Sequence, residues 1–142
     1  MSTTGIRRSI LFLALIVALA TFSGCGGGGS SSSTTDSGSA LPARTLSWEP
    51  PNSYVDNSTM NPVTDLDRFE IYVNESGSFT DTETPLAAVS AVNQATHSLT
   101  TSFNLANLGS SLTAGPRYYV SLRAVALTGL KSDFSPPVSF SF

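Results

Sequence analysis

The chain has 142 residues and a net charge of −3, from 7 basic and 10 acidic side chains. A single cysteine excludes a disulfide framework, a single histidine excludes a zinc site built on a histidine pair, and the acidic balance lacks the basic stripe of a nucleic-acid-binding protein. Seven of the 11 glycines precede Leu41, whereas all eight prolines follow it. The composition therefore predicts three segments, 1–24, 25–40 and 41–142, of which only the last can fold.

The N-terminal segment has the pattern of an export signal. Arg7 and Arg8 precede an unbroken apolar run of 11 residues, Ile10–Ala20. Because a helix needs about 20 apolar residues to cross a bilayer, this run is too short to be a stable span. A basic start followed by a short apolar run predicts a signal peptide over residues 1–24. The two arginines also leave the twin-arginine export route open, although the strongly apolar run favours the general secretory route.

The residues that follow the apolar run, Phe22-Ser-Gly-Cys25, resemble the lipobox of bacterial lipoproteins. Phe22 departs from that pattern, which usually has an aliphatic residue there. The resemblance implies a covalent diacylglyceryl group on Cys25, no other cofactor, and anchoring to a membrane without spanning it. Gly26 after the cysteine implies sorting to the outer membrane. The alternative is an ordinary signal peptide that ends beside a free cysteine.

The segment behind Cys25 has the composition of a flexible linker. Residues 26–40 are almost entirely Gly, Ser and Thr, so they cannot bury enough apolar surface to fold. Fifteen such residues span about 20 Å on average. A chain that begins at Cys25 loses Arg7 and Arg8 and has five basic against ten acidic residues, a net charge of −5. We therefore expect a tethered acidic domain with no nucleic-acid partner.

From Leu41 onward the sequence predicts an all-β fold. Apolar and polar residues alternate in short stretches, and turn residues separate these stretches about every ten positions. The alternation places Phe69 and Ile71 on a buried face and Glu70 and Tyr72 on the opposite face. Such patterns predict two antiparallel sheets packed as a β-sandwich. The predicted strands cover residues 44–48, 69–73, 101–105, 118–124 and 138–142.

Four of these motifs together resemble the fibronectin type III family, a branch of the immunoglobulin-like sandwiches. The first is the stretch from Leu112 to Tyr118 with its Pro/Gly turn, continued by the alternating apolar residues Val120, Leu122 and Ala124. The others are the tryptophan strand 45–51, the central strand 69–73 and the last strand that opens at 135–138. The resemblance covers residues 41–142. It implies that the Tyr118 hydroxyl bonds to backbone near Leu112 and that Trp48 fills the space between the sheets.

Two segments depart from the family pattern. The family's first strand would have to fit within Ser39 to Arg44, so this strand is expected to be short or missing. The connection from Asn52 to Leu66 is longer than usual and polar. Both departures leave the predicted core intact.

The sequence offers no set of residues for catalysis. His97 is the only candidate base and is expected on a solvent-facing strand, and Cys25 is expected to be blocked by lipid. The pairs Asp65/Asp67 and Asp81/Glu83 could supply alternating oxygen ligands, but calcium needs six to eight oxygens. We therefore expect no metal and no enzyme activity.

Two loops are candidates for a binding surface, because sandwich folds carry function on their end loops. The 52–66 loop contains Tyr54, and the 126–132 loop contains Leu127, Leu130 and Lys131. Ordinary loop chemistry remains an alternative for all four residues. The sequence thus predicts a non-catalytic envelope lipoprotein that serves protein–protein interaction or scaffolding. The alternative is a polysaccharide-binding module with a strip of exposed aromatics, Tyr54, Tyr72 and Tyr119.

Overall fold

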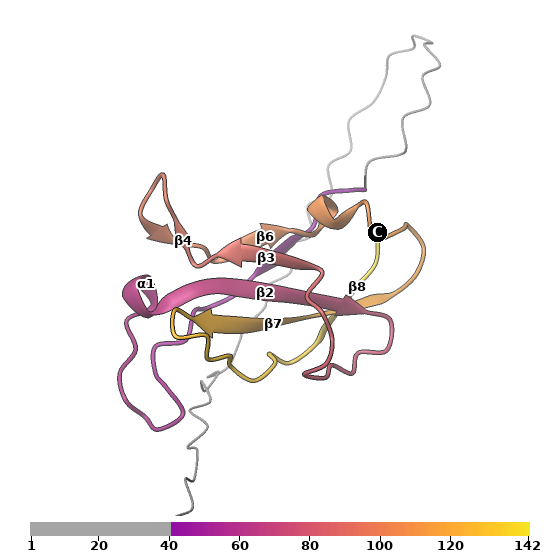
Figure 1. The fold of residues 1–142 in the computed structure, drawn as a ribbon. Coiled ribbons are helices and arrows are strands. Elements are labelled where there is room, and N and C mark those ends of the chain that lie inside the picture. The colour runs from indigo at the N-terminus through magenta and orange to yellow at the C-terminus, as the bar shows by residue number, and fades with distance from the viewer. Residues whose placement is uncertain (1–40) are drawn as a thin grey trace, which may run out of the picture.

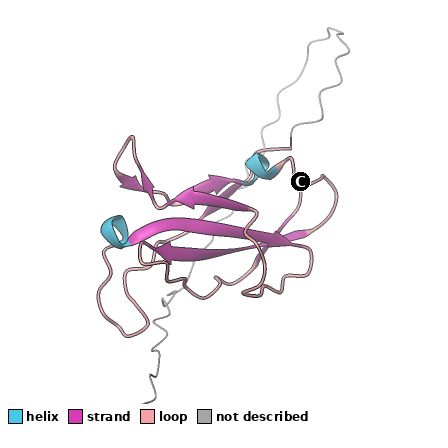
Figure 2. Cartoon of the chain, in the orientation of Figure 1, coloured by secondary structure: helices cyan, strands magenta, loops and turns pink. Residues whose placement is uncertain are grey.

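A computed structural model describes residues 41–142 of the chain. The predicted signal peptide, the lipidation site Cys25 and the linker 26–40 lie outside the described residues. Within 41–142 nearly all regular structure is antiparallel β-strand, and each of the two helices has four residues (Figure 2). The prediction of an all-β fold is confirmed.

The strands are short except for two that have nine residues each. In chain order the elements are β1 (Thr45–Ser47), α1 (Pro62–Asp65), β2 (Leu66–Asn74), β3 (Ala87–Ser90), β4 (Val92–Asn93), β5 (Ser98–Leu99), β6 (Ser102–Asn104), the 3₁₀-helix η1 (Leu105–Leu108), β7 (Tyr118–Ala126) and β8 (Val138–Phe140). The long strands β2 and β7 lie side by side (Figure 1). The three strands β3, β4 and β5 were not predicted.

The strands form one main sheet and two small ones, all antiparallel. The main sheet has the order β3-β2-β7-β8, and the small sheets pair β1 with β6 and β4 with β5. In the main sheet, Phe69 lies opposite Val89 on one side and Ala124 on the other. Because the register places apolar residues next to one another, one face of β2 and β7 is continuously apolar.

The core lies between this apolar face and the β1-β6 pair. Phe69 and Ile71 are completely buried, and the Trp48 ring meets the Phe69 ring edge-on at a centroid distance of 5.1 Å. Leu46 of β1 joins the same cluster. Two antiparallel layers with a shared apolar core give the fold a sandwich-like character. The residues predicted for the core are all buried: Trp48, Phe69, Ile71, Leu112, Tyr118, Val120, Leu122 and Ala124.

The tyrosine at the start of β7 fastens the preceding turn. The phenolic oxygen of Tyr118 accepts a hydrogen bond from the backbone N–H of Thr113, with an N–O distance of 3.2 Å. Thr113 directly follows Leu112, which is where the family resemblance implies such a bond. The Tyr118 ring itself is buried beside Phe140 of β8. One side chain therefore ties the turn, β7 and β8 together.

The predicted strand 101–105 is too long by one residue at each end. The strand β6 stops at Asn104, because the Asn104 side chain accepts a hydrogen bond from Ala106 N–H and caps η1. Leu105 is therefore the first residue of a helical turn rather than part of the strand face. It is buried all the same, whereas Thr101 is exposed.

The described residues before β1 contain no strand. Backbone at Arg44 accepts a hydrogen bond from Leu105 N–H at 2.7 Å, so the chain enters β1 directly beside η1. Leu41 lies against the same region, with its side chain next to Gly109. This agrees with the expected weakness of a first strand, although Ser39 and Ala40 lie outside the described residues.

Candidate functional site

Three connections meet at one end of the domain, which we call the loop end: 49–65, the β4-β5 hairpin and 127–130. The backbone N–H of Leu127 donates to the carbonyl of Asp65 at 2.9 Å and so joins the first connection to the third. Helix α1 contacts β5 of the hairpin. Figure 1 shows these segments together at the end where β2 begins and β7 finishes. The structure thus brings the two sequence-predicted binding loops into contact.

The 49–65 connection is internally ordered. Tyr54 N–H donates to Ser58 carbonyl at 2.9 Å, and an isolated bridge pairs Ser53 with Thr59. Asn57 closes the turn with a φ of 62°, a left-handed conformation that asparagine tolerates better than most residues. Met60 is buried in the core and fixes the base of this small hairpin.

The carboxylate of Asp65 organises the region where the loops meet. It accepts hydrogen bonds from Asn61 N–H at 2.9 Å and from the Thr64 hydroxyl at 2.8 Å, with the Tyr54 hydroxyl further off at 3.4 Å. These bonds lower the pKa of Asp65 below its ordinary value of 3.8, and the bond from Asn61 N–H contributes most. Asn61 caps α1 with its own side chain in return.

The loop end exposes three aliphatic side chains. Val55 is 39% exposed, Val63 of α1 is 47% exposed and Leu127 is 67% exposed. Tyr54, by contrast, is half-buried and packs against the core, so the expectation of an exposed Tyr54 is wrong. The apolar part of this surface is therefore aliphatic, and Leu127 is its most prominent member.

The other two predicted binding residues of the 126–132 loop hold the fold together. Leu130 is partly buried and packs against the core cluster. The ammonium of Lys131 donates to Glu70 Oε2 at 2.7 Å, and its side chain is 39% exposed. Of the four residues predicted from sequence, only Leu127 is mainly exposed without such a structural contact.

The end of the domain opposite the loop end holds the entry to the described chain. Leu41 lies beside η1, and η1 leads into the turn before β7. Figure 1 shows the C-terminus at this same end. The direction of the strands explains the separation, because β1 starts at this end and runs toward the loop end.

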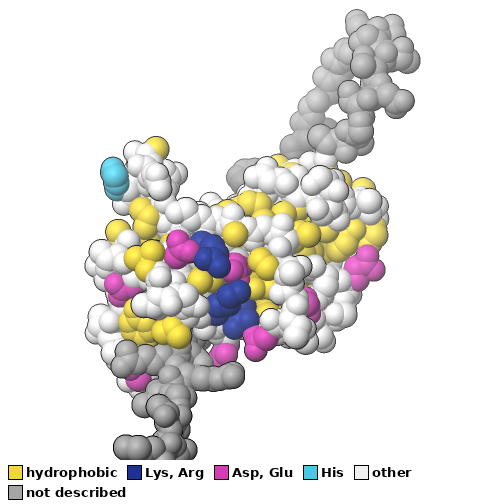
Figure 3. Space-filling view, viewed as in Figure 1, with side chains coloured by type: hydrophobic (Ala, Val, Ile, Leu, Met, Phe, Trp, Pro, Cys, Tyr) yellow, Lys and Arg dark blue, Asp and Glu magenta, His cyan; other side chains and the backbone are white. Residues whose placement is uncertain are grey.

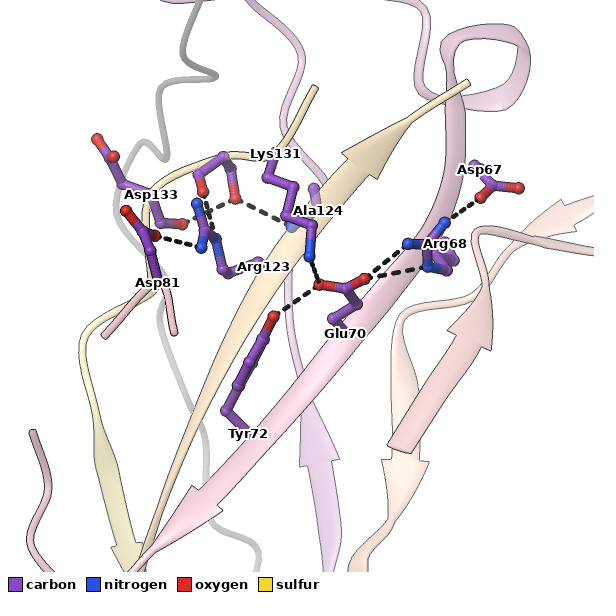
Figure 4. A network of polar contacts seen from close by, with 10 residues as sticks. Asp67, Arg68, Glu70, Tyr72, Asp81, Arg123, Ala124, Lys131 and Asp133 are labelled. Carbon is purple, nitrogen blue, oxygen red and sulfur yellow. Dashed lines mark hydrogen bonds and ion pairs between the residues drawn. The ribbon is translucent and has the colours of Figure 1, made fainter. Parts of the chain in front are cut away.

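The outer face of the main sheet, which points away from the core, carries a buried polar network (Figure 4). Glu70 is 3% exposed and Tyr72 is 2% exposed, so the sheet face opposite the core is buried at these residues too, and the expectation of an exposed Tyr72 is wrong. The β7-β8 connection covers them: Lys131 reaches Glu70, and the ring of Phe134 meets Tyr72 edge-on at 5.0 Å. Alternation alone could not reveal this cover, because it comes from a loop about 60 residues further along the chain.

Glu70 is the centre of the network. Its carboxylate accepts hydrogen bonds from Lys131 and the Tyr72 hydroxyl on one oxygen and from Arg68 on the other, each with a shortest distance of 2.7 Å. Burial by itself would raise the pKa of Glu70, but the bonds from Lys131, Tyr72 and Arg68 outweigh it and lower the pKa to about 2. Burial and the neighbouring Glu70 charge raise the pKa of Tyr72 to about 12. Glu70 is therefore ionised and Tyr72 neutral at ordinary pH.

Arg123 of β7 forms a second centre on the same face. It donates to the Ser132 carbonyl at 2.7 Å, pairs with Asp81 at 2.5 Å, and lies 4.6 Å above the Phe134 ring centre. Phe79 also stacks on Phe134, with ring centroids 5.7 Å apart. Figure 3 shows basic side chains gathered in the middle of this face with acidic side chains beside them. The basic side chains Arg68, Arg123 and Lys131 are thus paired with acidic side chains of the same domain.

Two serines replace the missing part of strand β8. Ser132 and Ser135 are buried, and their hydroxyls accept hydrogen bonds from Ala124 N–H at 2.9 Å and Leu122 N–H at 3.0 Å. The two prolines that follow, Pro136 and Pro137, cannot donate to a ladder. The serine side chains therefore satisfy the backbone of β7 where regular pairing is interrupted.

The remaining sequence candidates do not assemble into a site. His97 lies in the turn between β4 and β5 with a φ of 53°, rather than on a strand. Asp67 pairs with Arg68, and Glu83 accepts hydrogen bonds from Asn74 and Thr80. Residues 41–142 contain no group of three or more His, Cys, Asp or Glu side chains placed to hold a metal ion. The prediction of a strip of exposed aromatics is also wrong, because Tyr72 is buried.

Comparison with protein-family models, curated proteins and solved structures finds no significant match to this chain. Within the described part, neither helix is long and apolar enough to cross a membrane.

Proposed function

We propose that this chain is a non-catalytic lipoprotein of the bacterial cell envelope, sorted to the outer membrane, that presents one interaction domain on a flexible tether. A lipid on Cys25 is the anchor, and residues 26–40 are the tether. The observation that carries the proposal is the placement of Leu41 and the loop end at opposite ends of the domain. A domain attached through Leu41 presents its loop end away from the membrane.

We assign the domain to a fibronectin type III-like fold on the positions of the four motifs. The tryptophan motif lies on β1, the central motif on β2, the tyrosine motif on β7 and the last motif leads into β8. The central, tyrosine and last motifs are neighbours in one sheet, and the tryptophan strand lies in the other. The bond between Tyr118 and Thr113 supports the same assignment.

The partner that fits the loop end best is an envelope protein. Exposed aliphatic side chains such as Val55, Val63 and Leu127, set among polar loop residues, are typical of protein interfaces with an apolar centre and a polar rim. A polysaccharide surface would need exposed aromatics, and the buried Tyr72 is not among them. We therefore propose protein binding, and capture of glycan would be the result that contradicts it.

The anchor is tested by metabolic labelling with a radioactive fatty acid in a bacterial host. The wild-type chain should carry label and sediment with membranes, and Cys25→Ser should do neither. Ser23→Ala is a matched control, because it changes a neighbouring small residue and keeps the thiol. Label that persists in Cys25→Ser contradicts lipidation at this residue.

The binding surface is tested by a photo-crosslinking amino acid placed at Leu127. The same amino acid at Ser110, which is exposed near the opposite end, is the matched control. We expect a defined envelope protein to be captured from position 127 and not from 110. Equal capture from both positions, or capture of glycan alone, contradicts a protein-binding loop end.

A further inference from the structure

The strand β3 forms an open edge of the main sheet. Among the described residues, its only pairing partner is β2. Ala91 N–H donates to Asp67 carbonyl at 2.9 Å, so Asp67 and Ala91 form a hydrogen-bonded pair. In an antiparallel ladder such pairs recur at every second residue. The register then makes Phe69–Val89 a hydrogen-bonded pair. The backbone groups of the alternate residues, Ala88 and Ser90, therefore point outward from the sheet.

The same phase holds across the sheet. If odd-numbered residues of β2 bond to β3, its even-numbered residues bond to β7, and Leu122 and Ala124 of β7 must bond on the far side. Leu122 and Ala124 do bond there, to Ser135 and Ser132. The outward direction of Ala88 and Ser90 is thus supported by contacts on three strands.

This edge has fewer of the features that usually protect an edge strand than the opposite edge has: β3 has four residues, and Pro85 precedes Leu86 rather than the first residue of the strand. Natural proteins protect open edges with Lys, Pro, bulges or very short strands. The stretch Leu86–Ser90 contains no charged residue and no proline, and Ala88, Ser90 and the 38% exposed Leu86 face solvent. The opposite edge strand, β8, has three residues and follows directly on Pro136 and Pro137. Of the two edges of the main sheet, the edge of β3 is therefore the less protected.

We propose that β3 pairs with β3 of a second copy of this chain, antiparallel about a two-fold axis at Val89. Ala88 of one copy then lies opposite Ser90 of the other, and the N–H and C=O groups of these residues form four hydrogen bonds. The resulting sheet is continuous across both copies, with eight strands. Small side chains at both positions allow the two backbones to approach to ordinary strand spacing.

Charge favours a second copy over an unrelated strand. The chain from Cys25 has a net charge of −5, so two copies repel over most of their surfaces. The β3 edge is uncharged, and pairing it with itself places no like charges opposite each other. An edge without charges does not attract a basic or an acidic strand. A second copy of β3, by contrast, places a small residue opposite a small residue about the two-fold axis, Ala88 opposite Ser90.

The pairing should be weak in dilute solution and stronger on a membrane. Four backbone hydrogen bonds and a few small side chains bury less area than the roughly 800 Å² per partner of a standard stable interface. Confinement of tethered copies raises their effective concentration. That enhancement rests on the proposed lipid anchor, but the pairing itself does not.

The test is sedimentation velocity of residues 25–142 carrying Cys25→Ser, from about 10 µM to about 1 mM, the range in which a weak interface of this size populates. This chain keeps every residue of the core, which lies within 41–142. Ser90→Lys places a charge on the proposed edge. Ser102→Lys is the matched control, because Ser102 is an exposed serine on β6, also with its backbone directed away from the paired strand.

We expect a monomer–dimer equilibrium that Ser90→Lys weakens at least tenfold and Ser102→Lys leaves unchanged. Ala88→Pro, which removes one outward N–H without removing a β2-β3 bond, should weaken it equally. Thermal melting of each variant shows that the fold is intact. A chain that stays monomeric at the highest concentration, or dimers that resist both changes at β3, would overturn the proposal.

Discussion

The two faces of the main sheet are buried by different means. On the inner face, Phe69 and Ile71 pack against the second sheet through apolar contacts alone. On the outer face, Glu70 and Tyr72 are as deeply buried, but beneath the β7-β8 connection and within hydrogen bonds and ion pairs. Both faces of one strand are therefore closed to solvent, although its sequence alternates as if one face were open.

This difference indicates that the two faces stabilise the fold in different ways. Apolar burial is insensitive to pH and tolerates small shifts in geometry. The outer network depends on the charges of Glu70, Lys131 and Arg68, and on a loop held in one conformation. Substitutions on the two faces should consequently differ in their size and in their dependence on pH.

The largest effect is expected on the inner face. Trp48→Ala removes the ring that packs on Phe69 and should lower the free energy of unfolding by about 3–5 kcal/mol. Urea denaturation measures this loss. Trp48→Phe is the control: it keeps an aromatic ring and removes Nε1, which has no hydrogen-bond partner among the described residues, so it should cost much less. Equal losses in both variants would show that ring packing is not the cause.

A smaller and pH-dependent effect is expected on the outer face. Glu70→Gln removes the charge that Lys131 and Arg68 contact and should cost about 1–3 kcal/mol at neutral pH. The pKa of Glu70 is lowered to about 2 in the fold from its ordinary value of 4.5. Its contribution is therefore complete above about pH 4.5 and disappears as the pH falls toward 2.

Urea denaturation of both proteins between pH 2 and pH 7 checks this sign. The stability difference between wild type and Glu70→Gln should shrink as the pH falls, while the loss in Trp48→Ala stays constant. A difference that grows in acid would mean that the fold raises the pKa of Glu70 instead of lowering it.

The contrast between the faces also explains how far the sequence predicts this fold. Alternation places Phe69, Ile71, Val120 and Leu122 correctly, because a strand has only two faces and the apolar one is buried. It fails for Glu70 and Tyr72, since their cover comes from residues distant in the chain. The sequence carried only a weak signal of this cover. The β7-β8 connection contains Lys131, whose charge is opposite to that of Glu70, and Phe134, whose ring packs on that of Tyr72.

The binding candidates show the same limit. Composition located the loops that contain Tyr54 and Leu127, but it could not separate side chains that hold the loop from those that face solvent. The distinction depends on contacts such as Leu127 N–H to Asp65 and Lys131 to Glu70, which join segments far apart in sequence. The short strands β3, β4 and β5 were missed because stretches of two to four residues carry almost no periodic signal.

An intermediate effect is expected where one polar atom supports the inner face. Tyr118→Phe keeps the buried ring and removes the oxygen that accepts from Thr113 N–H, so the cost should be about 1 kcal/mol. Thermal melting measures it. Tyr119→Phe, at the half-buried neighbouring position, is the matched control and should change little. A loss in Tyr118→Phe as large as that in Trp48→Ala would mean that the substitution disturbs the packing of the ring, and that the lost hydrogen bond is not the main cause.

The smallest effect on stability is expected at the loop end. Leu127→Asn changes a side chain that is 67% exposed, so the free energy of unfolding should stay within about 0.5 kcal/mol of wild type. Leu130→Asn, three residues further along, changes a side chain that packs against the core and should cost more. If the loop end binds a partner, Leu127→Asn should reduce photo-crosslinking from a probe at Val63 without lowering the melting temperature. A variant that melts as wild type and captures the partner equally well would remove Leu127 from the binding surface and leave it a solvent-exposed loop residue.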